Sequence, residues 1–270
     1  MSATPPLTST ARYRPATTLA SVVVVLLGLN MLASLLGIAS DFVQVDLARD
    51  GVVFGEGAAD APFDTREIVI LLIALFELLV FVPTVVIFCV WMYRAHKNLV
   101  ALGNPRQHLE HPPGWAVGSF FVPIINLFVP YRAAREIWAK SDPEVTTFDT
   151  PFARYALSAP SVLKLWWGFW VASNILNNVS FRLSWSGEGV AAATASAWVD
   201  LFANILEIPA ALFAIAVVRG VVERQERRAR LVNYVDNVPP PPPIFSPQTV
   251  PSPFDAGYAA RPPHGPGPNT

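Results

Sequence analysis

The feature that most constrains this chain is an uncharged, apolar stretch at residues 115–131, WAVGSFFVPIINLFVPY. Its composition favours lipid over water. Four residues nevertheless interrupt any regular helix: Gly118, Pro123, Asn126 and Pro130. Proline removes a backbone donor and kinks a helix, so this stretch is not expected to form one straight membrane helix. The way it sits in a membrane decides on which side all later residues lie.

The composition indicates an integral membrane protein. Hydrophobic residues make up 53% of the 270 positions and charged residues 14%, and the mean hydropathy is +0.41. A soluble domain has about 25% charged residues. The chain has no strongly basic region of the kind that binds nucleic acid. Its one cysteine, Cys89, lies in an apolar run, so no disulfide can form within the chain.

Hydropathy predicts an all-α, polytopic membrane protein. We expect four transmembrane helices at about 19–40, 67–103, 161–181 and 189–235, within a membrane domain at 19–237. The segment at 115–131 would be re-entrant or interfacial, and an amphipathic surface helix would follow at 131–141. Residues 1–18 form a polar N-terminus. A signal peptide cleaved after Ala39 is the alternative to a retained first helix.

Two connecting segments are predicted to be polar. Residues 41–66 contain six carboxylates before Arg66 and are expected to form a solvated loop, in which VQVDL and GVVFG could pair as a small hairpin. Their spacing matches no EF-hand calcium loop. In the surface helix, the sequence assigns Arg132, Arg135 and Lys140 to the polar side. Ala134, Ile137 and Trp138 would form the apolar side.

Basic residues predict the topology. If the stretch at 115–131 does not cross and the N-terminus is cytoplasmic, sixteen of the nineteen Lys and Arg residues lie inside. The three outside are Arg49, Arg66 and Arg182. If the stretch crosses, six lie inside and thirteen outside. Lysine and arginine near helix ends favour the cytoplasm, so we expect four crossings, with both termini cytoplasmic in the cell membrane.

A family resemblance rests on YRAHKNLVALG, then GWAVGSFFVPIINLFVPY and REIW. This region, mainly residues 91–143, resembles the bacterial integral-membrane family catalogued as domain of unknown function 4328. The pattern is carried by Trp115, Gly118, Pro123, Asn126, Pro130 and Tyr131. The resemblance implies a multi-spanning membrane protein and supplies no reaction, ligand or catalytic residue.

Carboxylates inside the predicted spans are the main candidates for a functional site. Glu77, Asp200 and Glu207 would each cost about 2.5–3.5 kcal/mol if they faced lipid at the membrane centre. Asp200, Asn204 and Glu207 share one stripe of one helix. Glu77 and Asp200 lie at similar depths, which allows a shared polar cluster with Asn174 and Asn30. The cluster either links helices by hydrogen bonds or forms a proton or cation path or a small polar binding site.

Other chemistry is weakly supported. His96, His108 and His111 share one loop, but two prolines follow His111, no cysteine joins them, and we expect no metal site. The chain has no serine elbow, phosphate loop, dinucleotide fingerprint or HExxH motif. We therefore expect neither an enzyme nor a cofactor.

Two functions remain open. The first is a structural or interaction module that lies in the lipid bilayer and presents a cytoplasmic platform. Its proline-rich tail at 238–270, with a polyproline II run at 239–243, is predicted to be disordered and could bind a cytoplasmic protein partner. The alternative is a small transporter or channel that uses the intramembrane acidic cluster. The sequence leaves the oligomeric state open.

Overall fold

The computed structural model describes residues 12–51, 65–104, 106–143, 160–187 and 189–237. All regular elements in these ranges are helices, as the composition predicts. The longer ones are α1 (Thr17–Arg49), α2 (Thr65–Ala101), α3 (Pro113–Gly118), α4 (Val129–Lys140), α6 (Ser161–Ser186) and α7 (Gly189–Asn237). Three single-turn helices accompany them: η1 (Arg106–His108), η2 (Ser119–Phe121) and η3 (Ile125–Leu127).

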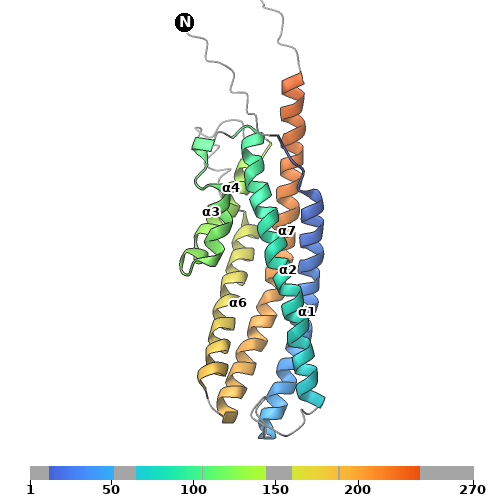
Figure 1. The fold of residues 1–270 in the computed structure, drawn as a ribbon, viewed down its shortest axis with the longest axis vertical. Coiled ribbons are helices and arrows are strands. Elements are labelled where there is room, and N and C mark those ends of the chain that lie inside the picture. The colour runs from blue at the N-terminus through green and yellow to red at the C-terminus, as the bar shows by residue number, and fades with distance from the viewer. Residues whose placement is uncertain (1–11, 52–64, 105, 144–159, 188, 238–270) are drawn as a thin grey trace, which may run out of the picture.

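The four longest helices form an elongated bundle around α7 (Figure 1). Helix α7 packs against α1 and against α6, and α2 packs against α1. The short helices α3 and α4 lie together beside one end of this bundle, next to α2 (Figure 1). We call this end, where α2 and α4 finish, the α4 end, and the opposite end, where α2 begins, the Arg66 end.

Three helices are long and apolar enough to cross a membrane: α1, α2 and α7. Their most apolar windows have mean hydropathies of 2.5, 2.8 and 2.2, and only 28%, 17% and 39% of those windows is buried. A helix that is apolar yet exposed requires lipid around it, so this is a multi-pass membrane protein. The predicted span at 161–181 corresponds to α6, which is not among the three. The bent pair Arg106–Phe121 and Ile125–Lys140 would be a fourth if it crossed.

The polar loop predicted from residue 41 onward is wrong in its first part. Helix α1 continues to Arg49, so Val43–Leu47 is helical and does not form a hairpin strand. At this end of α1, Arg66 at the start of α2 lies 3.1 Å from Asp50 and 3.6 Å from Asp46. The second half of that loop, 52–64, lies outside the described residues. Likewise, α6 continues to Ser186, beyond the predicted helix end at about residue 181.

Helix α2 ends at Ala101, close to the predicted bound at 103, and Gly103 forms its cap. Gly103 has a φ of +86°, which glycine tolerates because it lacks a Cβ. The Gly103 amide donates to the Val100 carbonyl at 3.2 Å, and the Asn104 amide donates to the Leu99 carbonyl at 3.0 Å. This paired arrangement is a Schellman cap. It turns the chain sharply at the α4 end.

The apolar stretch bends back on itself. The pair Arg106–Phe121 and Ile125–Lys140 makes an angle of 111°. Both flanks of the stretch are held by α7, because the Arg228 guanidinium donates to the Leu102 carbonyl at 2.8 Å and to the Asp142 carbonyl at 2.6 Å. The Asn104 side chain also donates to the Lys140 carbonyl at 3.2 Å. The stretch therefore starts and finishes at the same end of the bundle.

The tip of this hairpin contains a strained γ-turn. Ile124 has φ +66° and ψ −47°, and the Ile125 amide donates to the Pro123 carbonyl at 2.7 Å. A γ-turn with positive φ is rare, and a strained backbone of this kind costs about 1–3 kcal/mol. The side chains of Phe121, Ile124 and Phe128 are 67%, 74% and 58% exposed. The tip thus presents large apolar groups outward.

Helices α7 and α4 approach closely at Gly220, so a methyl group added at this position should lower stability. A Cβ on Gly220 would lie 2.6 Å and 2.7 Å from two ring atoms of Trp138. Arg224 also contacts this ring, with its guanidinium carbon 4.4 Å from the ring centroid. We expect Gly220→Ala to lower the free energy of unfolding in detergent by about 1–3 kcal/mol, through overpacking.

Gly28→Ala is the matched control for this substitution. Gly28 lies in the middle of α1, and a Cβ there would meet nothing within 4 Å. Alanine should stabilise the helix at this site by about 0.5–1 kcal/mol. Thermal unfolding of both variants in one detergent measures the difference. Equal midpoints for the two variants would contradict the tight α4–α7 contact.

Candidate functional site

The carboxylates singled out in the sequence lie together between helices α1, α2 and α7. We call the group Asp41, Glu77, Asp200, Asn204 and Glu207 the acidic cluster. Glu77 on α2 lies close enough to Glu207, Asp41 and Asp200 to interact with each electrostatically. Asp41 was not predicted as a member, because the sequence placed it in a loop; the longer α1 brings it in.

Hydrogen bonds tie most of the acidic cluster to its neighbours. Asn204 donates to Asp41 at 3.0 Å, and Glu207 accepts from Ser34 at 3.0 Å and from Asn177 at 2.8 Å. Asp200 has a hydrogen-bonding contact with Ser180. These bonds join α1, α6 and α7 through polar side chains.

One oxygen of the acidic cluster is not satisfied in this way. Glu77 Oε1 is buried and has no hydrogen-bond partner among the described residues. It lies against Gly37, where an added Cβ would be 2.5 Å from it and 2.7 Å from Asn204 Nδ2. The small residue at position 37 therefore brings α1 close to α2 and α7. A buried polar oxygen without a hydrogen-bond partner is costly, so Glu77 Oε1 is the exception within the acidic cluster.

The two asparagines expected beside the carboxylates bond elsewhere. Asn30 donates to the Thr84 hydroxyl at 2.6 Å and links α1 to α2 nearer the α4 end. Asn174 donates to the carbonyl of Trp170 on its own helix at 2.7 Å. In its place Asn177, one turn along α6, reaches Glu207. Sequence spacing could not separate these, because both asparagines lie near the same depth on α6.

The residues that carry the family pattern shape the hairpin at the α4 end. Trp115 and Gly118 lie on α3, Pro123 and Asn126 flank the γ-turn, and Pro130 is buried in the first turn of α4. The Tyr131 ring lies 6.1 Å from Trp167 on α6. Trp167 also donates to the carbonyl of Leu127 at 3.1 Å. The pattern therefore specifies how the hairpin turns and where it docks.

A second polar group, absent from the sequence-based expectations, lies at the α4 end. We call it the end network; its members are His96, Asn98, Asn104, Glu136, Lys140, Gln225 and Arg228. All seven are buried. They come from α2, α4, α7 and the cap of α2. Its members on α2 and α7 lie at the polar ends of two of the three helices that qualify as membrane spans. Its members on α4 and in the cap of α2 lie outside those helices.

Glu136 on α4 is the most strongly bonded carboxylate of the end network. It contacts Lys140 at 2.5 Å and His96 Nε2 at 3.4 Å, and it accepts from the Glu110 amide at 2.7 Å. Burial by itself would raise the pKa of Glu136. The hydrogen bonds from His96, Lys140 and the Glu110 amide outweigh burial and lower this pKa to about 2.

Gln225 connects three elements inside the end network. Its amide nitrogen donates to the Ala95 carbonyl at 2.8 Å and to the Ser141 hydroxyl at 3.1 Å. Its oxygen accepts from Asn98 at 3.2 Å. Asn98 in turn donates to the Arg14 carbonyl at 2.9 Å. The residues just before α1 and just after α4 are thus both fixed to α2 and α7.

The end network corrects one part of the predicted surface helix. Arg132 is exposed as expected and Arg135 is half-buried, but Lys140 is buried and donates to Glu136 and to the His108 carbonyl. The sequence did contain a signal for this. Glu136 and Lys140 are four residues apart on one helix face, the spacing of an intrahelical ion pair. Amphipathicity alone assigned Lys140 to water.

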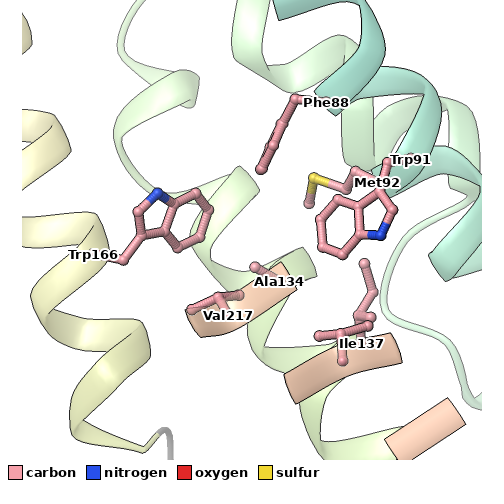
Figure 2. A pocket seen from close by; sticks show the side chains of 8 residues that line it. Phe88, Trp91, Met92, Ala134, Ile137, Trp166 and Val217 are labelled. Carbon is pink, nitrogen blue, oxygen red and sulfur yellow. The ribbon is translucent and has the colours of Figure 1, made fainter. Parts of the chain in front are cut away.

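An apolar contact region, here called the apolar joint, lies between the helices that meet near the end network (Figure 2). Side chains from α2, α4, α6 and α7 surround a small cavity of about 10 Å³. Its lining is formed by Phe88, Trp91, Met92, Ala134, Ile137, Trp166, Val217 and Val221. A cavity this small and apolar stays dry. The joint therefore packs the hairpin helix α4 firmly into the bundle.

The three histidines of the predicted loop have different surroundings. His96 is buried against Glu136, His108 is exposed, and His111 is half-buried. No group of three or more His, Cys, Asp or Glu side chains arranged to hold a metal ion occurs among the described residues.

Comparison with known proteins identifies the family. No curated protein and no solved structure matches this chain. A family model described as Domain of unknown function (DUF4328) matches residues 58–223, from before α2 into the charged part of α7. The match extends well beyond the motif region at 91–143 and includes Glu77, Asp200 and Glu207. Because it spans more than half of the chain, this protein belongs to the DUF4328 family.

Proposed function

We propose that this protein is a non-enzymatic, structural or interaction module of the cell membrane that presents a rigid platform to the cytoplasm. The platform consists of the α4 end, with its hairpin and end network. The single observation that carries this proposal is that buried polar groups fix both flanks of the hairpin to α2 and α7. Buried hydrogen-bonded groups of this kind define one orientation.

The same contacts support four crossings by α1, α2, α6 and α7, with the stretch at 115–131 re-entrant. Arg228 and Asn104 hold the two flanks of the stretch at one end. Exposed Phe121, Ile124 and Phe128 at the tip would meet lipid, which explains why a strained turn exposes apolar groups. Sixteen of nineteen basic residues then lie on the cytoplasmic side, together with both termini.

Single cysteines test this arrangement in a protein whose Cys89 is replaced by serine. Gln107→Cys, Arg132→Cys and Ser184→Cys each place a thiol at an exposed site. We expect a membrane-impermeant maleimide to label the first two only after the cytoplasmic side is opened, and the third in intact cells. Labelling of positions 107 and 132 from opposite sides would rule out the re-entrant stretch and the cytoplasmic platform with it.

A second candidate is a small proton-coupled transporter or channel. The observation that favours it is the acidic cluster, in which Glu77 Oε1 is buried beside three other carboxylates and has no hydrogen-bond partner in the part of the chain that the structure describes. Intramembrane carboxylates of this kind commonly carry protons in pumps and transporters. Polar side chains from α1, α6 and α7 bond to the cluster.

Proton flux in liposomes tests the transporter. If the protein conducts protons, Glu77→Gln together with Asp200→Asn should reduce flux to the level of empty liposomes, because neither amide can exchange a proton. Asp46→Asn, an exposed carboxylate at the Arg66 end, is the control and should leave flux unchanged. Equal flux from the double variant and the unaltered protein would exclude a path through the acidic cluster.

The proline-rich segment at 238–270 separates the two functions. It lies outside the described residues. If it docks a cytoplasmic protein partner, deletion of 239–270 should abolish proximity labelling of that partner while insertion stays normal. A transporter should retain its flux after the same deletion.

A further inference from the structure

A groove that the proposed functions do not use runs between the start of α1 and the charged part of α7 (Figure 1 shows the two helices side by side). Its volume is about 530 Å³. It is lined by Thr17, Ala20, Ser21, Val24, Val25, Arg219, Val222, Glu223 and Glu226. Pockets of about 300–1,000 Å³ are large enough to hold most of a small organic ligand.

The groove has apolar side chains along part of its wall and charged side chains in a fixed order along α7. Thr17 donates to Glu226 at 2.9 Å, so the first turn of α1 lies beside the charged C-terminal part of α7 and the two helices run antiparallel. Arg219 is the first charged residue of α7 after Glu207, and eleven uncharged residues separate the two. It therefore lies where the apolar span meets the headgroup layer. Glu223 and Glu226 follow at about 6 Å and 10 Å farther along the helix axis.

This order, one cation at the edge of the hydrocarbon and two carboxylates beyond it, matches a zwitterionic phospholipid. The phosphate of a lipid lies deeper than the ammonium that it carries. Guanidinium groups bind phosphate through two parallel hydrogen bonds. Carboxylates accept hydrogen bonds from a primary ammonium, whereas a quaternary ammonium has no N–H to donate. The valines and Ala20 offer contact to the glycerol and the first acyl carbons.

We propose that the groove binds one phospholipid whose headgroup carries a phosphate and a primary ammonium, of the phosphatidylethanolamine kind. Arg219 holds the phosphate, and Glu223 and Glu226 accept from the ammonium. The existing contacts of both carboxylates are surface contacts: Glu223 pairs with Arg227 at 2.5 Å, where both side chains are more than 60% exposed. Glu226 accepts from Thr17 at 2.9 Å through one oxygen, and Arg230 lies 4.0 Å from the other. Such surface pairs contribute little and exchange readily. A serine headgroup would add a third carboxylate beside these two and is disfavoured.

The test uses the full-length protein in nanodiscs of phosphatidylethanolamine and phosphatidylcholine in equal amounts with identical acyl chains. Native mass spectrometry counts the lipids that the released protein retains. One charge-assisted hydrogen bond separates the two headgroups, so we expect about tenfold more retained ethanolamine lipid than choline lipid. Nanodiscs with added phosphatidylglycerol show whether phosphate alone suffices.

Two sets of variants assign the headgroup atoms. Glu223→Gln with Glu226→Gln should leave a lipid bound but equalise ethanolamine and choline. Arg219→Gln should lower retention of both. Glu110→Gln and Lys97→Gln each remove one charge, of the same sign as in the two sets, from exposed side chains at the same end outside the groove, and should change nothing. Ser21→Trp fills the groove from an exposed position and should remove the preferred lipid.

Several results would overturn the proposal. These are equal retention of the two lipids by the unaltered protein, tighter retention of phosphatidylglycerol, or a preference that survives either Glu223→Gln with Glu226→Gln or Ser21→Trp. Size-exclusion chromatography of each variant separates a lost site from a lost fold. The outcome does not depend on which function the protein has, because the groove requires only that the bundle lies in a bilayer.

Discussion

Replacing Glu136 with alanine should destabilise this protein more than any other single substitution at the α4 end. The change leaves Lys140 and His96 buried without the carboxylate that both contact. Removing one member of a buried ion pair typically costs about 3–5 kcal/mol. For a chain of this size that corresponds to a fall of roughly 10 °C in the unfolding midpoint. Thermal unfolding in a mild detergent measures it.

Two controls sharpen this result. Glu110→Ala removes an exposed carboxylate. Residue 110 contacts Glu136 through its backbone amide, which the substitution keeps, so stability should change by less than about 0.5 kcal/mol. Adding Lys140→Met to Glu136→Ala removes the stranded cation and should recover part of the loss. If the double variant is less stable than Glu136→Ala, the ion pair is not the source of the effect.

The lowered pKa of Glu136 also predicts that the free energy of unfolding falls in acid, which we call the acid limb of its pH dependence. Its pKa is about 2 in the folded protein and 4.5 when unperturbed. Because the folded-state value is the lower one, Glu136 stabilises the fold fully above pH 4.5. That contribution, on the order of 3 kcal/mol, is lost as the pH falls from 4.5 toward 2. Glu136→Gln should flatten this limb.

Gln225→Ala should give the second large effect, by releasing α4 from α7. The substitution removes bonds to Ala95, Ser141 and Asn98, and it leaves buried groups unsatisfied. We expect a loss of about 2–3 kcal/mol. A cysteine at Ala139, which is 2% exposed, should then react faster with a small maleimide as the end of α4 loosens.

Arg230→Ala is the control for Gln225→Ala on the same helix. Its side chain is 78% exposed and lies 4.0 Å from Glu226, so its loss should have little effect on stability. Gln225→Ala and Arg230→Ala with equal unfolding midpoints and equal labelling at position 139 would show that the end network does not hold α4.

Local sequence was sufficient to predict the four long helices, though not their full lengths, and the turn that follows the C-terminal end of α2. The uncharged runs are long enough to cross a bilayer, and Gly103 followed by Pro105 marks a helix end. It also grouped Asp200, Asn204 and Glu207, because helical spacing puts them on one face. The family motif, too, was readable, since its glycine and prolines lie close together in the chain.

What the sequence determined about this protein was periodic or compositional: apolar helices, their approximate bounds, a broken apolar stretch and a stripe of carboxylates. The tertiary structure alone decided which polar residues meet. Asp41 meets Glu77 because α1 runs past its apolar span. Lys140 is buried because its ammonium donates to Glu136 and to the carbonyl of His108, which lies more than thirty residues earlier in the chain. A buried ion pair forms only when distant helices exclude water from it, and no local pattern encodes that exclusion.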